Sequence, residues 1–176
     1  MREIEVKVLD INKEKIKDKL INIGAKLVKD EYQYNYIFDT EERYLKSNYN
    51  GYLRIRKTIS KEGKEKINLT LKRNIPNKKI RENIENSIVI DNVEEGMKIL
   101  EVLGYKLINK GTKHRKSYKY SKFLFEIDEW DKKTYPKPYL EIEAKKEKDL
   151  EEALEILNID KEKTTNKSIE ELREDI

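Results

Sequence analysis

The chain has 176 residues and no cysteine, so it suits one domain and excludes a disulfide framework, a zinc–cysteine site and a thiol nucleophile. Charged residues make up 42% of the chain, but the formal net charge is only +4, which is a weak argument for nucleic-acid binding. No run approaches about 18 apolar residues and no basic–apolar leader is present, so we expect a cytoplasmic protein without a signal peptide or a membrane span.

Eight stretches alternate between apolar and polar residues with the period of two that is typical of a β-strand. The first, residues 3–7 (Glu-Ile-Glu-Val-Lys), places its charged side chains on one face and its branched apolar side chains on the other. Residues 47–51 predict a loop between the second and third strands. The predicted strands cover about residues 2–9, 32–39, 52–58, 66–73, 80–90, 110–120, 123–129 and 139–145.

Helices are predicted where apolar residues recur every three or four positions. Asn12 is a typical cap for the first helix, and Gly24 and Gly104 are typical residues for ending the first and second helices. Near the end of the chain, Ser168 and Glu171 have the spacing of a capping box. The predicted helices cover about residues 12–23, Asp91 or Asn92 to Gly104, 149–158 and a short segment that begins at Ser168.

One internal similarity suggests a duplication within a single domain of residues 1–176. Residues 20–27 match residues 100–107, and at the same offset the first predicted strand lies over the fifth. The sequence is therefore consistent with a pseudo-repeat of residues 1–80 and 81–176.

The two faces of the predicted strands differ in chemistry. The apolar face gives the helices a surface to cover, whereas the polar face carries carboxylates on some strands and Arg or Lys on others. The motif at residues 3–7 returns as Glu-Ile-Glu-Ala-Lys at residues 141–145, so two strands share an acidic pattern. The charged residues of the polar faces are Glu3, Glu5, Lys7, Arg54, Arg56, Lys72, Arg81, Glu85, Arg115, Glu126, Asp128, Glu141, Glu143 and Lys145.

Two architectures fit these faces. One is an ordinary α+β sheet with helices on one side and charged residues in water on the other. The second is an eight-stranded antiparallel closed β-barrel with helices packed outside, in which the charged faces line a lumen. We favour the second architecture, an α+β fold with a closed barrel, because eight antiparallel strands tend to close and thereby remove their exposed edges.

A charged lumen is costly unless its charges are matched. Glutamate oxygens are hard ligands suited to Mg²⁺ or Mn²⁺, and Arg and Lys suit phosphate oxygens. The number of predicted lumen cations exceeds what one phosphate needs and fits a chain of about three. The composition of the polar faces therefore indicates a divalent metal and a triphosphate.

An ExExK strand, paired arginines in Leu53-Arg54-Ile55-Arg56 and Lys72 on the next strand together resemble the CYTH superfamily, the triphosphate tunnel metalloenzymes. The resemblance covers essentially the whole chain and is strongest to the class IV adenylyl cyclase and thiamine triphosphatase group. Its further positions are Arg81, Glu85, Leu103-Gly104-Tyr105, residues 113–118, residues 125–128, residues 139–143 and Lys167-Ser168.

The resemblance implies a role for each matching position. It implies metal ligands at Glu3, Glu5, Asp128, Glu141 and Glu143. It implies phosphate-binding residues at Lys7, Arg54, Arg56, Lys72, Arg81, Arg115 and Lys167. Strand parity adds Glu126 and Lys145 as candidates, and we take Glu3, Glu5 and Lys7 as the candidate catalytic residues.

We therefore expect a metal-dependent enzyme that converts ATP to cyclic AMP and pyrophosphate, as a class IV adenylyl cyclase does. A triphosphatase acting on tripolyphosphate or thiamine triphosphate is the first alternative, and a non-catalytic polyphosphate or nucleotide binder is the second. We expect no membrane partner and do not favour an RNA- or DNA-binding module. A homodimer is compatible with the sequence, but no segment identifies its interface.

Two single residues are interpreted as structural. His114 is the one histidine of the chain and lies on the opposite strand parity from Arg115, so we expect it outside the lumen. Trp130 follows a strand and precedes a long loop, which favours a core or lid anchor over stacking against a base.

Overall fold

The computed structural model describes residues 2–76 and 81–175, with side chains from residue 4 onward. The predicted start of the fifth strand at residue 80 lies outside these residues. The strands are β1 (Arg2–Val8), β2 (Lys26–Asp39), β3 (Gly51–Ser60), β4 (Glu65–Ile75), β5 (Arg81–Ile90), β6 (Lys106–Tyr120), β7 (Phe123–Trp130), β8 (Tyr139–Ala144) and β9 (Thr164–Thr165). The helices are α1 (Lys13–Asn22), α2 (Tyr44–Tyr49), α3 (Val93–Val102), α4 (Glu147–Ile156), a 3-10 turn (Lys161–Lys163) and α5 (Ile169–Glu174).

The first eight strands form a closed antiparallel barrel, and this confirms the predicted α+β fold. The strand order is β5-β4-β3-β2-β6-β7-β8-β1-β9, and an additional pairing of β1 with β5 closes the circle. The short strand β9 pairs with the last two residues of β1, Lys7 and Val8. Closure leaves no long sheet edge exposed, because each barrel strand has a neighbour on both sides.

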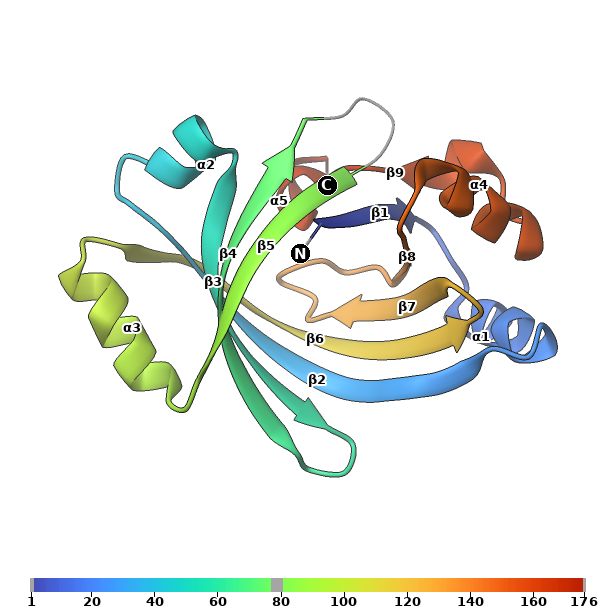
Figure 1. Cartoon of the computed structure of the whole chain (residues 1–176), viewed down its shortest axis with the longest axis horizontal. Helices are drawn as coiled ribbons and strands as arrows, with labels where there is room; N and C mark the ends of the chain where they lie inside the picture. Colours follow the sequence, from blue (N-terminus) through green and yellow to red (C-terminus); the bar gives the residue numbers. More distant parts are fainter. Residues whose placement is uncertain (1, 77–80, 176) are drawn as a thin grey trace.

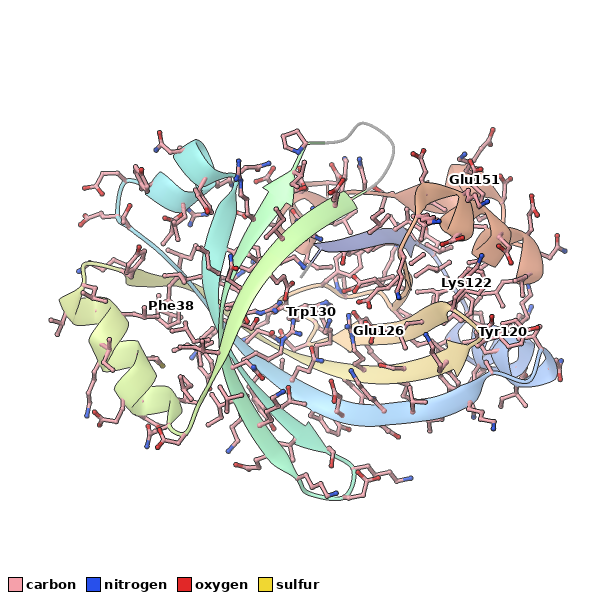
Figure 2. All side chains as sticks on the ribbon, in the orientation of Figure 1. Phe38, Tyr120, Lys122, Glu126, Trp130 and Glu151 are labelled. Atoms are coloured by element: carbon pink, nitrogen blue, oxygen red, sulfur yellow. The ribbon has the colours of Figure 1, made fainter. Side chains whose placement is uncertain are left out.

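Helices cover the outside of the barrel on two opposite flanks (Figure 1). On one flank, α1 and α4 pack against the apolar face of β1, β7 and β8, where Val6, Phe125 and Ile142 are buried. On the other flank, α3 covers a second core that contains Phe38 and Ile55 (Figure 2). No helix among the described residues is long and apolar enough to cross a membrane.

The strict alternation of the strands decides which side chains enter the barrel. In β1, Ile4 and Val6 belong to the outer core, whereas Glu5 and Lys7 line the lumen. In β3, Ile55 faces the core under α3, and Arg54 and Arg56 face inward. Because the apolar side chains of each strand pack into the outer core, the charged side chains that alternate with them point into the lumen.

The largest departures from the predicted boundaries lie in β2, in β6 and at residues 47–51. β2 begins at Lys26, six residues earlier than predicted, because its first part is exposed and shows no clear apolar alternation. β6 likewise begins at Lys106 and not at residue 110. The loop predicted at residues 47–51 contains the end of α2, a short helix whose first turn is held by main-chain hydrogen bonds to the buried Asp39 carboxylate.

Two strand–helix–strand units have matching ends. The Asn12 side chain accepts from the Lys15 main-chain N–H at 3.0 Å, as Asn92 does from Glu95 at 2.9 Å. Gly24 and Gly104 follow the two helices with φ of +83° and +89°, in the left-handed region that favours glycine. These features agree with the predicted pseudo-repeat, which stays a prediction.

Candidate active site

A cavity of about 710 Å³ occupies the barrel and is lined by residues from all eight barrel strands. Its wall is mostly charged, as the strand parity predicts. Ser168, Ile169 and Glu170 at the start of α5 complete the lining at one end. Figure 2 shows Glu126 and Trp130, both from β7, inside the barrel.

Three carboxylates meet where β1 lies beside β8. Glu5 is the direct cross-strand neighbour of Glu143, and an oxygen from each of Glu5, Glu141 and Glu143 lies within 4.8 Å of the others. Hard carboxylate oxygens at this spacing fit a divalent cation such as Mg²⁺ or Mn²⁺. The cluster contains three of the five predicted metal ligands.

Cations hold two of these carboxylates in the ionised form. Burial raises the pKa of Glu5, but Lys72, Lys7 and Arg81 outweigh that effect and leave the pKa below its ordinary value. The Arg81 Nε lies 3.1 Å from Glu5 Oε1. Lys7 Nζ lies 3.5 Å from Glu5 Oε1 and 3.3 Å from Glu141 Oε2, so it bridges two members of the cluster.

Glu141 is ionised for a similar reason. Its burial opposes ionisation, yet Lys7, Arg115 and Lys113 hold its pKa well below the ordinary value. A carboxylate that is already ionised binds a metal without losing a proton, so Glu5 and Glu141 can bind a divalent cation at neutral pH without releasing one.

A second wall carries the predicted phosphate-binding residues of β3 and β4. Lys72 Nζ forms an ion pair with Glu85 Oε1 at 2.8 Å, and Arg54 Nη2 lies 3.6 Å from Glu85 Oε2. Burial raises the pKa of Glu85, but Lys72 and Arg54 outweigh it and lower that pKa to about 2. The Arg54 Nε is buried and has no hydrogen-bond partner among the described residues.

Arg56 differs from its neighbours because its partner is neutral. Its Nε donates a hydrogen bond to Asn35 Oδ1 at 2.7 Å. Burial lowers the pKa of Arg56, and the positive charges of Arg54 and Arg115 lower it further, to about 10. The guanidinium is therefore a cation whose surroundings favour an incoming anion.

Arg115 is surrounded by carboxylates. Its Nε and Nη2 donate to the two oxygens of Asp128 at 2.6 Å each, and Nη2 also donates to Glu141 Oε1 at 2.8 Å. A further ion pair joins Arg115 Nη1 to Glu126. Burial lowers the pKa of Arg115, but Asp128, Glu126 and Glu141 together raise it well above the ordinary value.

Lys113 is a buried lumen lysine that sequence reasoning did not select as a site residue. Its Nζ donates to Asp128 Oδ2 at 2.8 Å and lies 5.2 Å from the centre of the Trp130 ring. Burial lowers the pKa of Lys113, and nearby Arg115 adds to that effect, so the pKa falls to about 8. The sequence does indicate that Lys113 faces the lumen, because Lys113 and Arg115 are two residues apart on one strand and point to the same face.

Two polar residues of β2 were also missed. Gln33 and Asn35 line the cavity and alternate with tyrosines at residues 32, 34 and 36. This alternation indicates that the polar residues of β2 share one face. It does not show which face is the lumen, because tyrosine suits both faces of a sheet. Of these tyrosines, Tyr32 is exposed and stacks on His114, which binds Asp30 on the outer surface, as expected for a structural histidine.

The structure does not bring every predicted residue to the carboxylate cluster. Both oxygens of Asp128 are taken by Arg115 and Lys113, so Asp128 lies in the ion-pair network beside the cluster. Lys167 lies outside the cavity lining, and its exposed side chain pairs with Asp175 at 2.7 Å. Lys145 is exposed beyond the end of β8, and the Glu3 side chain lies outside the described part of the chain.

The remaining predicted cations all reach the lumen. Lys7, Arg54, Arg56, Lys72, Arg81 and Arg115 line the cavity. Arg81 also donates to the Asn166 main-chain oxygen at 3.3 Å, which connects the lumen to the segment before α5. Trp130 donates from Nε1 to the Tyr139 hydroxyl at 2.9 Å, in agreement with its predicted role as an anchor.

Solved structures share this fold over nearly the full chain. PH1012 of Pyrococcus horikoshii OT3 is 27% identical, with 96% of this chain and 98% of that chain covered and a TM-score of 0.80. A Vibrio parahaemolyticus protein provisionally assigned as an adenylate cyclase is 15% identical, with 98% and 97% covered and a TM-score of 0.77.

A third similar structure has a described activity. HpAC1 of Hippeastrum, an adenylyl cyclase candidate with a dominant triphosphatase activity, is 18% identical, with 95% of this chain and 90% of that chain covered and a TM-score of 0.67. Similarity at 15% and 18% identity demonstrates a common fold and no more. A comparison with curated proteins gives no match. The model of the CYTH domain matches residues 1–169, and the chain therefore belongs to the CYTH domain family, as its motifs predicted.

Proposed function

We propose that this protein is a divalent-metal-dependent enzyme that processes a triphosphate inside its barrel, with the class IV adenylyl cyclase reaction as the leading activity. CYTH superfamily members are triphosphate-processing enzymes that depend on divalent metals. The observation that carries the proposal is one lumen that combines an acidic cluster of Glu5, Glu141 and Glu143 with Arg56, whose hydrogen-bond partner is the neutral amide of Asn35.

The residues on the two walls have complementary tasks. Glu5, Glu141 and Glu143 would hold Mg²⁺ or Mn²⁺, which neutralises phosphate charge and orients the phosphates when it is bound. Arg54 and Arg56 would hold phosphate oxygens through their planar guanidinium groups. Lys7 contacts Glu5 and Glu141, and in this proposal it lies between the metal and the phosphates.

Two reactions fit such a lumen. In the cyclase reaction, the 3′-hydroxyl oxygen of ATP bonds to the α-phosphorus, the bond from that phosphorus to the bridging oxygen breaks, and pyrophosphate and a proton leave. In the triphosphatase reaction, a water oxygen bonds to the terminal phosphorus, the bond from that phosphorus to its bridging oxygen breaks, the diphosphate part of the substrate leaves, and the attacked phosphorus becomes orthophosphate with release of a proton. Both are in-line displacements that need positioning and charge neutralisation more than covalent chemistry.

The triphosphatase is the second candidate because the same lumen serves it, and HpAC1, which shares the fold, has a dominant triphosphatase activity. We test the two by incubating the protein with ATP, tripolyphosphate and thiamine triphosphate, each with Mg²⁺ or Mn²⁺, and by identifying the products. Cyclic AMP with pyrophosphate supports the cyclase. Orthophosphate from tripolyphosphate with ATP unchanged overturns it in favour of the triphosphatase, and tight binding without any product indicates a non-catalytic binder.

The replacement Glu5→Gln tests the metal assignment. We expect turnover to fall by about a hundredfold or more, because one charged ligand oxygen of the cluster is lost. The matched control is Glu129→Gln on β7, since Glu129 pairs with Lys13 outside the barrel at 2.7 Å. Mn²⁺ binding measured by electron paramagnetic resonance should weaken in the first variant only. Full turnover and Mn²⁺ binding by Glu5→Gln would contradict the assignment.

A further inference from the structure

Asn35 and Arg56 face each other directly across the β2–β3 pair. The only acceptor of the Asn35 side chain, Oδ1, receives the Arg56 Nε hydrogen at 2.7 Å. The Asn35 Nδ2 donates to the main-chain oxygen of Gln33 at 3.1 Å, which fixes the orientation of the amide. Asn35 is only 3% exposed, so the contact is a built part of the lumen wall.

The chemistry of this partner distinguishes Arg56 from the other cations of the lumen. Among the described residues, Arg56 makes no ion pair, whereas Arg54, Lys72 and Arg115 each contact at least one carboxylate. A carboxylate at position 35 would orient Arg56 equally well but would neutralise it. The amide supplies the same acceptor geometry without the charge.

We propose that Asn35 is a positioning residue for triphosphate binding: it holds Arg56 by Nε and leaves the guanidinium charge and its Nη donors for the phosphate oxygens. This inference rests on the proposed function, because it assigns Asn35 a task at the same lumen site. It also explains why the wall opposite the carboxylate cluster contains a neutral acceptor in direct contact with an arginine.

The test uses two substitutions at residue 35 and one matched control. Asn35→Asp keeps the acceptor and adds a negative charge, and Asn35→Leu removes the acceptor without adding charge. The control is Asn109→Asp, which places the same new charge on the lining of the same cavity. Each full-length protein is titrated calorimetrically with imidotriphosphate, a hydrolysis-resistant triphosphate, in Mg²⁺ at several salt concentrations.

We expect Asn35→Asp to weaken imidotriphosphate binding by about tenfold or more and to make the affinity less dependent on ionic strength. Asn35→Leu should weaken binding by about three- to tenfold with an unchanged salt dependence, because the charge of Arg56 remains. Asn109→Asp should change the affinity by less than about threefold, since it does not neutralise Arg56.

Thermal unfolding separates these effects from misfolding. Asn35→Asp should unfold at the wild-type temperature or above it, because it gains an ion pair while it loses affinity. Wild-type affinity and salt dependence in Asn35→Asp would overturn the positioning role alone. Absence of imidotriphosphate binding by the wild-type protein would overturn the proposed function itself.

Discussion

Arg56 and Arg115 occupy the same kind of position in two different walls of the barrel. Each bonds to the residue directly opposite on the neighbouring strand, Asn35 for Arg56 and Asp128 for Arg115. The partner is an amide in one wall and a carboxylate in the other. Burial and neighbouring cations lower the pKa of Arg56 to about 10, whereas carboxylates raise that of Arg115 well above its ordinary value.

The difference separates two tasks within one lumen. Arg115 satisfies Asp128, Glu126 and Glu141 and is therefore part of the structure that holds β6, β7 and β8 together. Arg56 has no such internal partner and gains most from an anionic ligand. We infer that phosphate binding depends more on Arg56, and folding more on Arg115.

The largest expected effect is on the free energy of unfolding, when the charge of Arg115 or of Arg56 is removed. Arg115→Met should lower the free energy of unfolding by about 3–5 kcal/mol, because it leaves buried carboxylates without their cation. Arg56→Met should change it by less than about 1 kcal/mol, since losing a half-buried charge that makes no ion pair among the described residues offsets the unpaired Asn35 acceptor. Urea denaturation followed by circular dichroism measures both values.

The surface variant Lys13→Met controls for the loss of an ion pair as such. Lys13 and Glu129 pair at 2.7 Å, but both side chains are nearly half exposed. Their separation should cost about 1 kcal/mol or less. Equal destabilisation by Arg56→Met and Arg115→Met would show that the two walls do not differ as proposed.

A smaller effect is expected on ligand binding. Arg56→Met should weaken imidotriphosphate binding by about ten- to a hundredfold, because it removes a charged, bidentate donor from the lumen. Arg56→Lys should recover only part of the affinity, since an ammonium keeps the charge but not the planar donor geometry. Calorimetric titration gives the affinities, and wild-type binding by Arg56→Met would show that phosphates lie elsewhere.

The sequence was sufficient to predict the barrel because parity is strict in its strands. Ile4 and Val6 identified the outer face of β1, and Leu53 and Ile55 identified that of β3, so Glu5 and Arg54 were assigned to the lumen correctly. The boundaries of β2 and β6 were predicted less well. Their first residues are exposed, and an exposed strand needs no apolar alternation.

The sequence analysis did not assign which lumen charges pair with each other. Asp128 and Glu141 both point inward by parity, but only Glu141 lies in the carboxylate cluster. Strand register decides this, because Asp128 lies directly opposite Arg115. The register of β6 with β7 follows from the two-residue turn between them, whereas the register of β1 with β8, which places Glu5 opposite Glu143, joins segments far apart in the chain and is not given by local periodicity.

The smallest expected effect concerns proton binding by Lys113, which lies on β6 with Arg115 and directly opposite Gln33 of β2. Its pKa of about 8 in the folded protein lies below the ordinary value of 10.5, so between these two values the unfolded chain binds more protons. Lys113 should therefore make the protein more stable as pH rises from about 8 to about 10.5, and it should make no pH-dependent contribution below that window.

A bound triphosphate should raise the pKa of Lys113 and cause uptake of a fraction of a proton near pH 8.5. Titrations with imidotriphosphate in two buffers of different ionisation enthalpy measure this uptake. Lys113→Met removes the titrating group but keeps Asp128 paired with Arg115, so the difference between the two proteins excludes protons that belong to the ligand. Equal proton uptake by both proteins would mean that the phosphate charge does not reach Lys113, which would restrict the phosphate site to the wall that contains Arg56.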